Sequence, residues 1–322
     1  MTLDQLRYAV EVMKTKQFSR AAENCFISQP SLSVQIANLE TELGYKLFVR
    51  SRQGIEVTEA GRELLSQAQS VLDQANQLKV MAAEMKGEIK GHLRLGIIPS
   101  AGSSLLPLFL KRFMEAYPDV ELSVTEEPTQ QLVQHIDAGT LDCAILSTPQ
   151  RCPASLVEKP LFYEPFMVFA SKNHPVLDHR HASVSELSST EILLLDEAHC
   201  LRDQVLQLCK SKAAQDKRRL RIESASLQTL IDVIRKWEGY TLLPALATGM
   251  LTANEINKNL RSFEKPCPAR KISLVYHHVR NKKQLANALA NCIADVLPDE
   301  VFAPSKKTGV RVLSPAPEYF SL

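Results

Sequence analysis

The sequence predicts an α/β domain of two lobes, preceded by an N-terminal all-α winged helix-turn-helix and a long linker helix. Three observations predict this fold class. Apolar residues recur at helical spacing in residues 3–43, a strict four-three repeat occupies residues 64–85, and strand and helix patterns alternate from residue 92 onward. We therefore expect domains at residues 1–60, 61–90 and 91–300, followed by a flexible tail at 301–322.

Residues 1–60 predict three helices and a small hairpin. The third helix begins after Ser28, whose hydroxyl can cap it, and ends at Gly44. The start of such a helix can enter a DNA major groove, while basic hairpin residues meet phosphates. For each side chain taken singly, a solvated polar face is the alternative. The candidate DNA contacts are Gln29, Pro30, Ser31, Ser33, Gln35, Arg50 and Arg52.

The four-three repeat predicts a helix that pairs with a second copy of itself as a coiled coil. Its members are Leu64, Ala68, Val71, Ala75, Leu78, Ala82 and Met85. The alternative is a single amphipathic helix lying on its own domain, which would show a wider, drifting apolar stripe. We therefore favour dimerisation through residues 61–90.

From residue 92 the pattern is typical of an α/β domain with mostly parallel sheets. A region of this length suits two lobes better than one compact unit. We expect lobe I at about 91–162 and 268–298 and lobe II at about 163–267. The chain is expected to cross between the lobes at residues 160–165 and 266–270.

Composition limits the function classes. The formal net charge of +2 does not indicate nucleic-acid binding, so an argument for DNA must rest on pattern. No apolar run reaches the roughly 18 residues of a membrane span, and residues 1–16 carry charges that a secretory signal lacks. Seven scattered cysteines are too few for a secreted disulfide framework, so we expect a cytoplasmic protein.

Cys200 and Cys209 form the most informative pair in the chain. If residues 201–210 form a helix, the two α-carbons stand roughly 13 Å apart. A disulfide tolerates at most about 7 Å between α-carbons. A bond between these thiols would therefore force a change of shape, which is typical of a switch. For an arbitrary pair of cysteines, two unrelated core residues would be the usual interpretation.

The surroundings of Cys200 predict an activated thiol. A cysteine is reactive as the thiolate, and a helix start at Cys200 together with Arg202 would lower its pKa. Zinc binding by His199, Cys200 and Cys209 is a poorer alternative, because no compact fourth ligand accompanies them.

Five blocks within the first 61 residues resemble the DNA-binding signature of the LysR-type transcriptional regulators. They are Phe18-Ser19-Arg20-Ala21-Ala22, Ser28-Gln29-Pro30-Ser31-Leu32-Ser33, Leu39-Glu40-Thr41-Glu42-Leu43-Gly44, Leu47-Phe48-Val49-Arg50 and Thr58-Glu59-Ala60-Gly61. The run His199-Cys200-Leu201-Arg202-Asp203-Gln204 with Cys209 resembles the peroxide-sensing members of that family, as do residues 96–100, 141–143 and 241–247. The resemblance covers nearly the whole chain and implies periplasmic-binding-protein-like lobes.

The resemblance also implies the chemistry of the thiols. Hydrogen peroxide would oxidise Cys200, the peroxidatic thiol, to a sulfenic acid, and Cys209, the resolving thiol, would then form a disulfide with it. The implied peroxide-binding residues are Ser100, Thr129, His199, Asp203 and Arg270. Ser100 stands where the resemblance would place a threonine, so the hydroxyl is kept and a methyl group is lost.

The implied partners are double-stranded DNA, RNA polymerase, hydrogen peroxide as the signal, a cellular thiol reductant and further copies of this chain, as a homodimer and a homotetramer. The implied activity is that of a transcription activator of oxidative-stress genes, which is not an enzyme and uses no cofactor, metal or membrane. Two rivals stay open. One is a LysR-type regulator that binds a small organic effector between its lobes, and the other is a thiol peroxidase, for which the DNA-binding head has no purpose.

Overall fold

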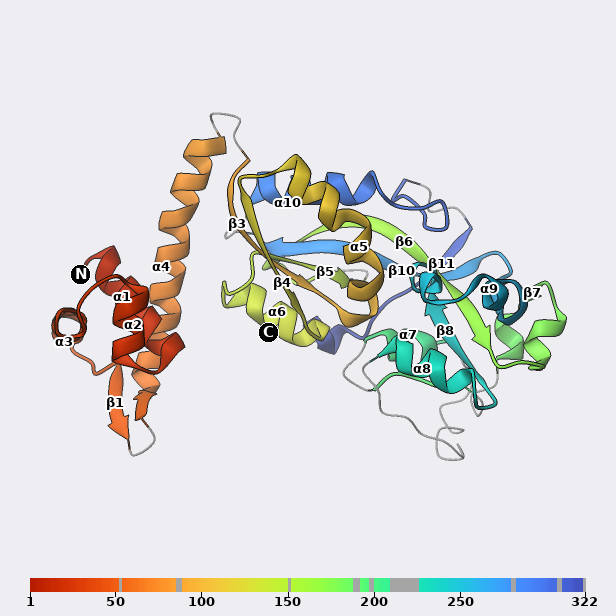
Figure 1. The fold of residues 1–322 in the computed structure, drawn as a ribbon, viewed down its shortest axis with the longest axis horizontal. Helices are drawn as coiled ribbons and strands as arrows, with labels where there is room; N and C mark the ends of the chain where they lie inside the picture. The colour runs from red at the N-terminus through yellow and green to blue at the C-terminus, as the bar shows by residue number, and fades with distance from the viewer. Residues whose placement is uncertain are drawn as a thin grey trace. The chain divides into compact units, whose positions relative to one another are not determined.

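The computed structural model describes residues 1–51, 54–84, 89–149, 152–187, 192–196, 200–208, 226–278, 282–305 and 309–320. The chain divides into two compact units, Met1–Gly87 and Glu88–Leu322 (Figure 1). The first unit is mostly helical and the second is α/β, in agreement with the predicted fold class.

The first unit begins with α1 (Leu3–Thr15), α2 (Phe18–Asn24) and α3 (Gln29–Leu43). Ser28 caps α3, because its hydroxyl oxygen accepts a hydrogen bond from the backbone N–H of Ser31 at 3.3 Å. Gly44 ends the helix with a left-handed backbone at φ 74°. The predicted hairpin follows as antiparallel β1 (Phe48–Ser51) and β2 (Gly54–Val57), and α4 (Glu59–Glu84) completes the unit.

A buried carboxylate joins α3 to the hairpin. Glu40 is 7% exposed, and its Oε1 accepts hydrogen bonds from the backbone N–H groups of Leu47 at 2.9 Å and Phe48 at 3.3 Å. Gly61 brings α4 against the same place, because a Cβ there would lie 2.4 Å from the carbonyl oxygen of Leu47. The hairpin is therefore fixed to both helices by residues close to it in sequence.

The first half of α4 packs within its own unit, because it lies along α1. From α4, Leu65 and Ala68 belong to the core of this unit, and Leu64, Val71 and Leu72 pack against it. This is the wider stripe of a helix lying on its own domain, the alternative that the repeat did not favour. Further along, Ala75 is half-buried and Leu78 is 70% exposed. Met85 and the side chain of Ala82 lie outside the described part of the chain.

The second unit is built on a mixed sheet. Its strands are β3 (Gly91–Ile97), β4 (Val120–Glu126), β5 (Cys143–Ser147), β6 (Leu156–Ala170), β7 (His181–Ala182), β8 (Tyr240–Pro244), β9 (Leu260–Phe263), β10 (Cys267–His277) and β11 (Val310–Leu313). They are arranged in the order β4-β3-β5-β10-β6-β9-β7, with β8 on β6 and β11 on β10. β3 runs parallel to β4 and β5, whereas β10 runs antiparallel to β5 and β6. The mostly parallel sheet that we expected is therefore wrong for the central strands.

Helices cover this sheet on both faces. They are α5 (Pro99–Ala116), α6 (Thr129–Asp137), α7 (Cys200–Leu206), α8 (Leu227–Ile234), α9 (Ala253–Asn259) and α10 (Lys283–Ala294), with short 3-10 helices η1 (Pro175–Asp178), η2 (Val184–Glu186), η4 (Ala245–Met250) and η5 (Pro317–Phe320). α5 and α10 lie together on one side of β3, β4 and β5, and α6 lies on the other (Figure 1).

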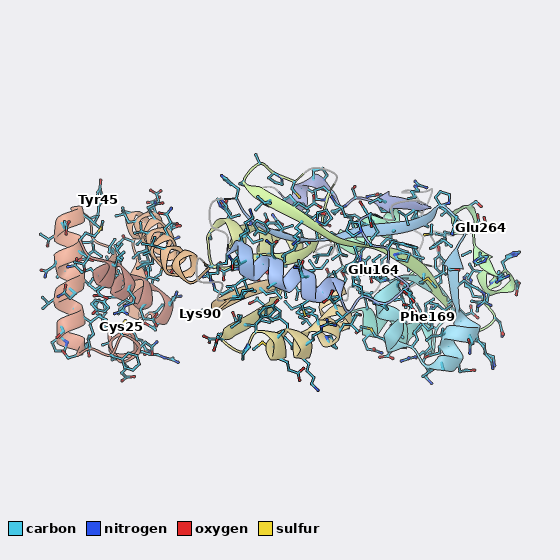
Figure 2. The ribbon with its side chains drawn as sticks, turned by 90° about the horizontal axis from the view of Figure 1, so that it is seen from above. Cys25, Tyr45, Lys90, Glu164, Phe169 and Glu264 are labelled. Carbon is cyan, nitrogen blue, oxygen red and sulfur yellow. The ribbon has the colours of Figure 1, made fainter. Side chains whose placement is uncertain are left out.

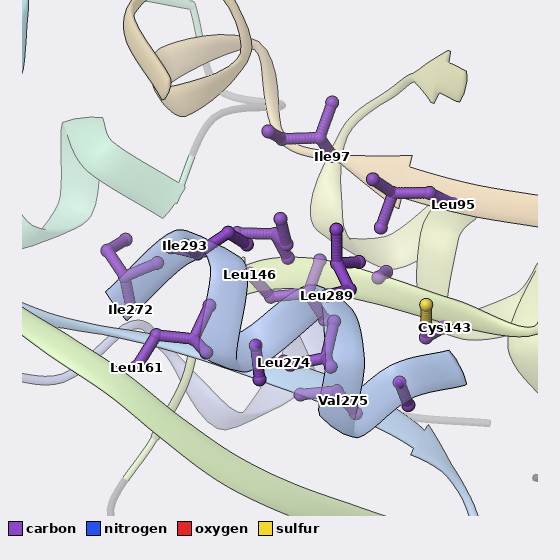
Figure 3. Packing of buried hydrophobic residues seen from close by; sticks show 14 of the residues in the cluster. Leu95, Ile97, Cys143, Leu146, Leu161, Ile272, Leu274, Val275, Leu289 and Ile293 are labelled. Carbon is purple, nitrogen blue, oxygen red and sulfur yellow. The ribbon is translucent and has the colours of Figure 1, made fainter. Parts of the chain in front are cut away.

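Two hydrophobic cores give this unit its two lobes. One contains Leu95, Leu146 and Leu289, of which Leu289 lies on α10 (Figure 3). The other contains Phe169 and Leu201 together with residues of α8. β6 and β10 pass through both cores and pair with each other along their shared length. The two predicted crossings, at residues 160–165 and 266–270, are thus mostly continuous strand, because each strand can serve both lobes.

The C-terminal segment differs from the flexible tail that we expected. β11 pairs in parallel with β10, with Leu313 beside Arg270. Phe320 in η5 is 4% exposed and joins the core of the first lobe. Proline and lysine predicted a loose tail, but backbone pairing and the burial of two apolar side chains hold residues 309–320 in place.

Candidate thiol site

Cys200 is the first residue of α7, and its side chain is enclosed. It is 3% exposed and carries a free thiol. The hydroxyl of Thr129, the first residue of α6, lies 3.5 Å from Cys200 Sγ and donates to it. Thr129 itself is 1% exposed. The start of α6 therefore supplies a hydroxyl donor to the buried sulfur at the start of α7.

The electrostatic surroundings of Cys200 differ from our expectation. Burial raises its pKa, because the thiolate loses water, and the Thr129 hydroxyl and the Arg270 charge oppose this only in part. The negative charge of Asp203 raises it further. The predicted net lowering of the pKa by the helix start and Arg202 is therefore wrong, although the backbone N–H of Cys200 does act to lower it. Arg202 Nη1 approaches the carbonyl oxygen of Leu195 at 3.5 Å, and the Arg270 cation on β10 acts to lower the pKa of the thiol.

Arg270 is fully buried and held on both sides. Its Nε donates to Glu164 Oε2 at 2.8 Å, its Nη1 donates to Ser100 Oγ at 2.7 Å, and its Nη2 donates to the Ser100 carbonyl oxygen at 2.9 Å. Glu164 Oε1 accepts from the backbone N–H of Leu246 at 2.9 Å. Both members of the pair are nearly inaccessible to water, at 0% and 1% exposure.

Glu164 was missed by the sequence analysis. It lies on β6 in the middle of the second unit (Figure 2). The signal that could have found it is a single acidic residue within an apolar run, since a carboxylate in such a strand must be paired. Its partner could not be read from the sequence, because Arg270 follows it by 106 residues.

The rest of α7 is joined to the C-terminal segment. The Tyr319 hydroxyl donates to Asp203 Oδ2 at 2.8 Å, and burial together with this bond raises the pKa of Tyr319. Gln204 is 0% exposed, and its Nε2 donates to Ser147 Oγ at 3.0 Å and to the Leu313 carbonyl oxygen at 2.8 Å. Tyr319 was not among the predicted site residues, because we expected a loose tail at that position.

Four of the five predicted peroxide-binding residues are described, and each bears on Cys200. Thr129 contacts the sulfur, Arg270 and Asp203 shift its pKa, and Ser100 holds the Arg270 guanidinium. His199 and Cys209 lie outside the described residues. The helix that we expected through residue 210 is described as helix only as far as Leu206. The predicted separation of the two thiols is therefore not tested.

The other described cysteines have environments that suppress the thiolate. Burial raises the pKa of Cys143, whose sulfur lies within the first lobe's core (Figure 3). Burial and the Glu158 carboxylate raise the pKa of Cys152 to about 12. Neither is given a hydroxyl donor and a buried cation together, as Cys200 is. Cys267 begins β10.

The candidate DNA contacts cluster at the start of α3. Gln29, Pro30 and Ser31 are exposed, and Ser33 and Gln35 are half-buried. Gln35 Oε1 accepts from Gln5 Nε2 at 3.0 Å, so α1 orients this amide. Arg52 and the side chain of Arg50 lie outside the described residues.

Within the described ranges, His, Cys, Asp and Glu side chains form no group of three or more suited to a metal ion, but the zinc alternative involves His199 and Cys209, which lie beyond them. None of the described helices is both long and apolar enough to cross a membrane.

Comparison with known families gives two matches. Residues 3–62 match the bacterial regulatory helix-turn-helix protein, lysR family, and residues 86–298 match the LysR substrate binding domain. The first match covers α1 to the start of α4, and the second covers the second unit from β3 to α10.

Curated relatives match over most of their length. The protein of Escherichia coli K12 described as DNA-binding transcriptional dual regulator OxyR is 36% identical over 293 residues, which cover 90% of this chain and 95% of the relative. A hydrogen peroxide-inducible genes activator from Haemophilus influenzae is 35% identical over 307 residues, covering 92% and 99%.

Solved structures of similar proteins agree with the fold. A full-length OxyR variant from Pseudomonas aeruginosa superposes with a TM-score of 0.77 at 32% identity, covering 92% of this chain and 99% of that one. An OxyR mutant from Corynebacterium glutamicum, described as bound to hydrogen peroxide, superposes with a TM-score of 0.61 at 32% identity, covering 92% of each chain.

Proposed function

Because this chain belongs to the LysR family of bacterial regulatory helix-turn-helix proteins, we propose that it is a DNA-binding transcription regulator that senses hydrogen peroxide. The sensing step is oxidation of Cys200, followed by a disulfide bond with Cys209. Its relatives described as hydrogen peroxide-inducible genes activators support this assignment.

The observation that carries the proposal is the environment of Cys200. A thiol at 3% exposure has a hydroxyl donor 3.5 Å from its sulfur and a fully buried guanidinium whose charge favours the thiolate. Burying polar and charged groups costs free energy, so such groups are usually paired with each other or belong to a functional site. A peroxide molecule is small enough to approach a thiol that larger oxidants cannot reach.

The chemistry balances with peroxide as the oxidant. The sulfur of Cys200 attacks one peroxide oxygen, the O–O bond breaks, and the thiol proton goes to the leaving oxygen, which departs as water. Cys200 is then a sulfenic acid. The sulfur of Cys209 attacks it, the S–O bond breaks, a second water leaves, and an S–S bond forms.

The surrounding side chains have separate roles in this proposal. Ser100, Thr129, His199, Asp203 and Arg270 hold the peroxide, and hydrogen bonds to both of its oxygens stabilise the charge that develops on the leaving oxygen before it takes up the proton. Glu164 holds the Arg270 guanidinium toward Ser100. Burial raises the pKa of Cys200, so the Thr129 hydroxyl and the Arg270 charge are needed to favour the attacking thiolate.

The disulfide would act on DNA through oligomer contacts. We propose that α4 pairs the chain as a homodimer through the part of the repeat that its own head leaves exposed, such as Leu78. Two dimers would form a tetramer, in which a change in the lobes resets the spacing of the DNA-binding heads. The candidate contacts at the start of α3 would then read the major groove.

The remaining partners follow from the same proposal. The oxidised regulator would activate oxidative-stress genes through contact with RNA polymerase, and a cellular thiol reductant would restore Cys200 in the cytoplasm. The chain would act as a sensor with no cofactor, and not as a thiol peroxidase. Excess reductant should therefore support no rapid catalytic turnover of peroxide.

A DNA footprint of the full-length protein, with and without stoichiometric peroxide, tests the proposal. We expect the footprint to change with peroxide in the wild type and in Cys152→Ser, and to stay unchanged in Cys200→Ser. A full response by Cys200→Ser, together with calorimetric binding of a metabolite, would support the organic-effector rival instead.

A further inference from the structure

The C-terminal segment, residues 309–320, contacts each element that supplies a described side chain next to Cys200. β11 pairs with β10 beside Arg270, and η5 packs against α6, whose first residue is Thr129. The segment begins beyond residue 298, where the match to the LysR substrate binding domain ends. The family's domain therefore does not account for it.

Three hydrogen bonds join this segment to α7 and the turn that follows. Tyr319 donates to the Asp203 carboxylate at 2.8 Å, Gln204 donates to the Leu313 carbonyl oxygen at 2.8 Å, and Gln207 donates to the Ser314 carbonyl oxygen at 2.7 Å. The bond to Asp203 has a charged acceptor and is therefore stronger than a neutral pair. The Gln204 amide is fully buried, so water does not replace its partner while the segment stays in place.

We expect disulfide formation at the enclosed Cys200 thiol to disturb these contacts. A second sulfur must come within about 2 Å of Cys200 Sγ. That sulfur atom is enclosed in the present packing, and the residues that follow it, Leu201 and Val205, are 2% and 3% exposed in the second lobe's core. We therefore expect the start of α7 to leave its place, and Asp203 and Gln204 lie within the same two turns.

We propose that residues 309–320 form a latch that holds α7 in its reduced conformation and is released when Cys200 is oxidised. The latch rests on the proposed function for its trigger, namely oxidation by hydrogen peroxide and condensation with the Cys209 thiol with loss of water. Its own contribution is to set how often α7 opens in the reduced protein, and hence how readily the disulfide forms.

The opening of α7 is measured by alkylation of Cys200 in the reduced full-length protein. We expect Tyr319→Phe, which removes one hydroxyl and keeps the ring, to raise the alkylation rate about tenfold, since the lost bond has a charged acceptor. Gln207→Ala should raise it by a smaller factor. Tyr117→Phe is the matched control and should leave the rate unchanged.

A general loss of stability would imitate this result, so each variant is also unfolded in denaturant. The latch predicts faster alkylation of Cys200 while the unfolding midpoint stays near that of the wild type. Unchanged alkylation in Tyr319→Phe overturns the latch, and so does an increase that merely follows a lower midpoint. These outcomes decide the latch even if peroxide has no effect on the protein.

Hydrogen exchange before and after peroxide treatment tests the release. We expect the amides of residues 310–313 to exchange at least about tenfold faster in the oxidised wild type, and to stay protected in peroxide-treated Cys200→Ser. If mass spectrometry finds the Cys200–Cys209 bond while these amides stay protected, the latch is wrong and the proposed function stands. If no such bond forms, the proposed function fails, and the alkylation rates still decide the latch.

Discussion

The helix-turn-helix head is held together by residues that are close in the sequence, whereas the thiol site is built from residues that are far apart in it. In the head, Glu40 and Gly61 both contact Leu47 and hold the hairpin against α3 and α4, and all three residues belong to one short stretch of the chain. The thiol site instead joins Ser100, Thr129, Glu164, Cys200, Arg270 and Tyr319. The difference teaches that damage to the head should stay local, whereas damage to the thiol site should reach several elements.

The largest expected effect is at the buried ion pair. Glu164→Leu would leave the Arg270 charge fully buried without its carboxylate, and we expect the free energy of unfolding of the second unit to fall by about 3–5 kcal/mol. Denaturant unfolding followed by the fluorescence of Trp237, the sole tryptophan, measures this.

Two controls accompany that experiment. Glu121→Leu changes an exposed glutamate and should shift stability by no more than about 0.5 kcal/mol. The double variant Glu164→Leu/Arg270→Met removes both charges and should recover much of the loss. Wild-type stability in Glu164→Leu would show that the pair does not hold the lobes together.

A core substitution in the head is next in size. Leu32 is 0% exposed, and Leu32→Ala should lower the stability of the head by about 2–5 kcal/mol. DNA binding should be lost in a gel-shift assay, while peroxide still oxidises Cys200 at the wild-type rate. Val34→Ala, at an exposed position, is the control. Slower oxidation in Leu32→Ala would contradict the separation of the two regions.

This contrast also explains what could be predicted. Sequence signals only a few residues long predict the caps at Ser28 and Gly44 and the hairpin, so our prediction of the head agreed with the structure. The Glu164–Arg270 pair and the Tyr319–Asp203 bond join residues 106 and 116 positions apart, and no local pattern encodes them. The pKa of Cys200 was misjudged for a related reason. Proximity of Arg202 in sequence suggested a lowered value, while burial by distant elements raises it.

A third prediction concerns base recognition at α3. Gln35→Ala should reduce discrimination between specific and non-specific DNA by about 1–3 kcal/mol if its amide contacts a base edge. Competition binding at fixed salt measures this. Thr41→Ala, on an exposed position near the other end of α3, should not change discrimination. An equal loss of discrimination in Gln35→Ala and Thr41→Ala would show that Gln35 does not contact a base.

The smallest effect is at the donor to the thiol. Thr129→Val removes the hydroxyl that lies 3.5 Å from Cys200 Sγ, and we expect oxidation by peroxide to slow by about fivefold, which corresponds to roughly 1 kcal/mol. Stopped-flow measurement of thiol loss gives the rate, with Thr125→Val as the control. An unchanged rate in Thr129→Val would exclude this hydroxyl from the reaction.

The pH dependence of Cys200 alkylation shows whether the surroundings raise or lower the pKa of this thiol. Because the pKa of Cys200 is raised above its ordinary value of 9.0, alkylation of the unliganded protein should be slow at neutral pH and keep increasing as the pH rises above that value. Thr129→Val should move the profile to still higher pH. A plateau near neutral pH would contradict a pKa governed by burial.

Peptide mapping by mass spectrometry after treatment with stoichiometric peroxide tests the central claim most directly. We predict a single new linkage between Cys200 and Cys209, present in the wild type and in Cys152→Ser, with a sulfenic acid retained at Cys200 in Cys209→Ser. Peroxide treatment that leaves Cys200 unmodified, or that links other cysteines first, would contradict the claim that Cys200 is the sensing thiol.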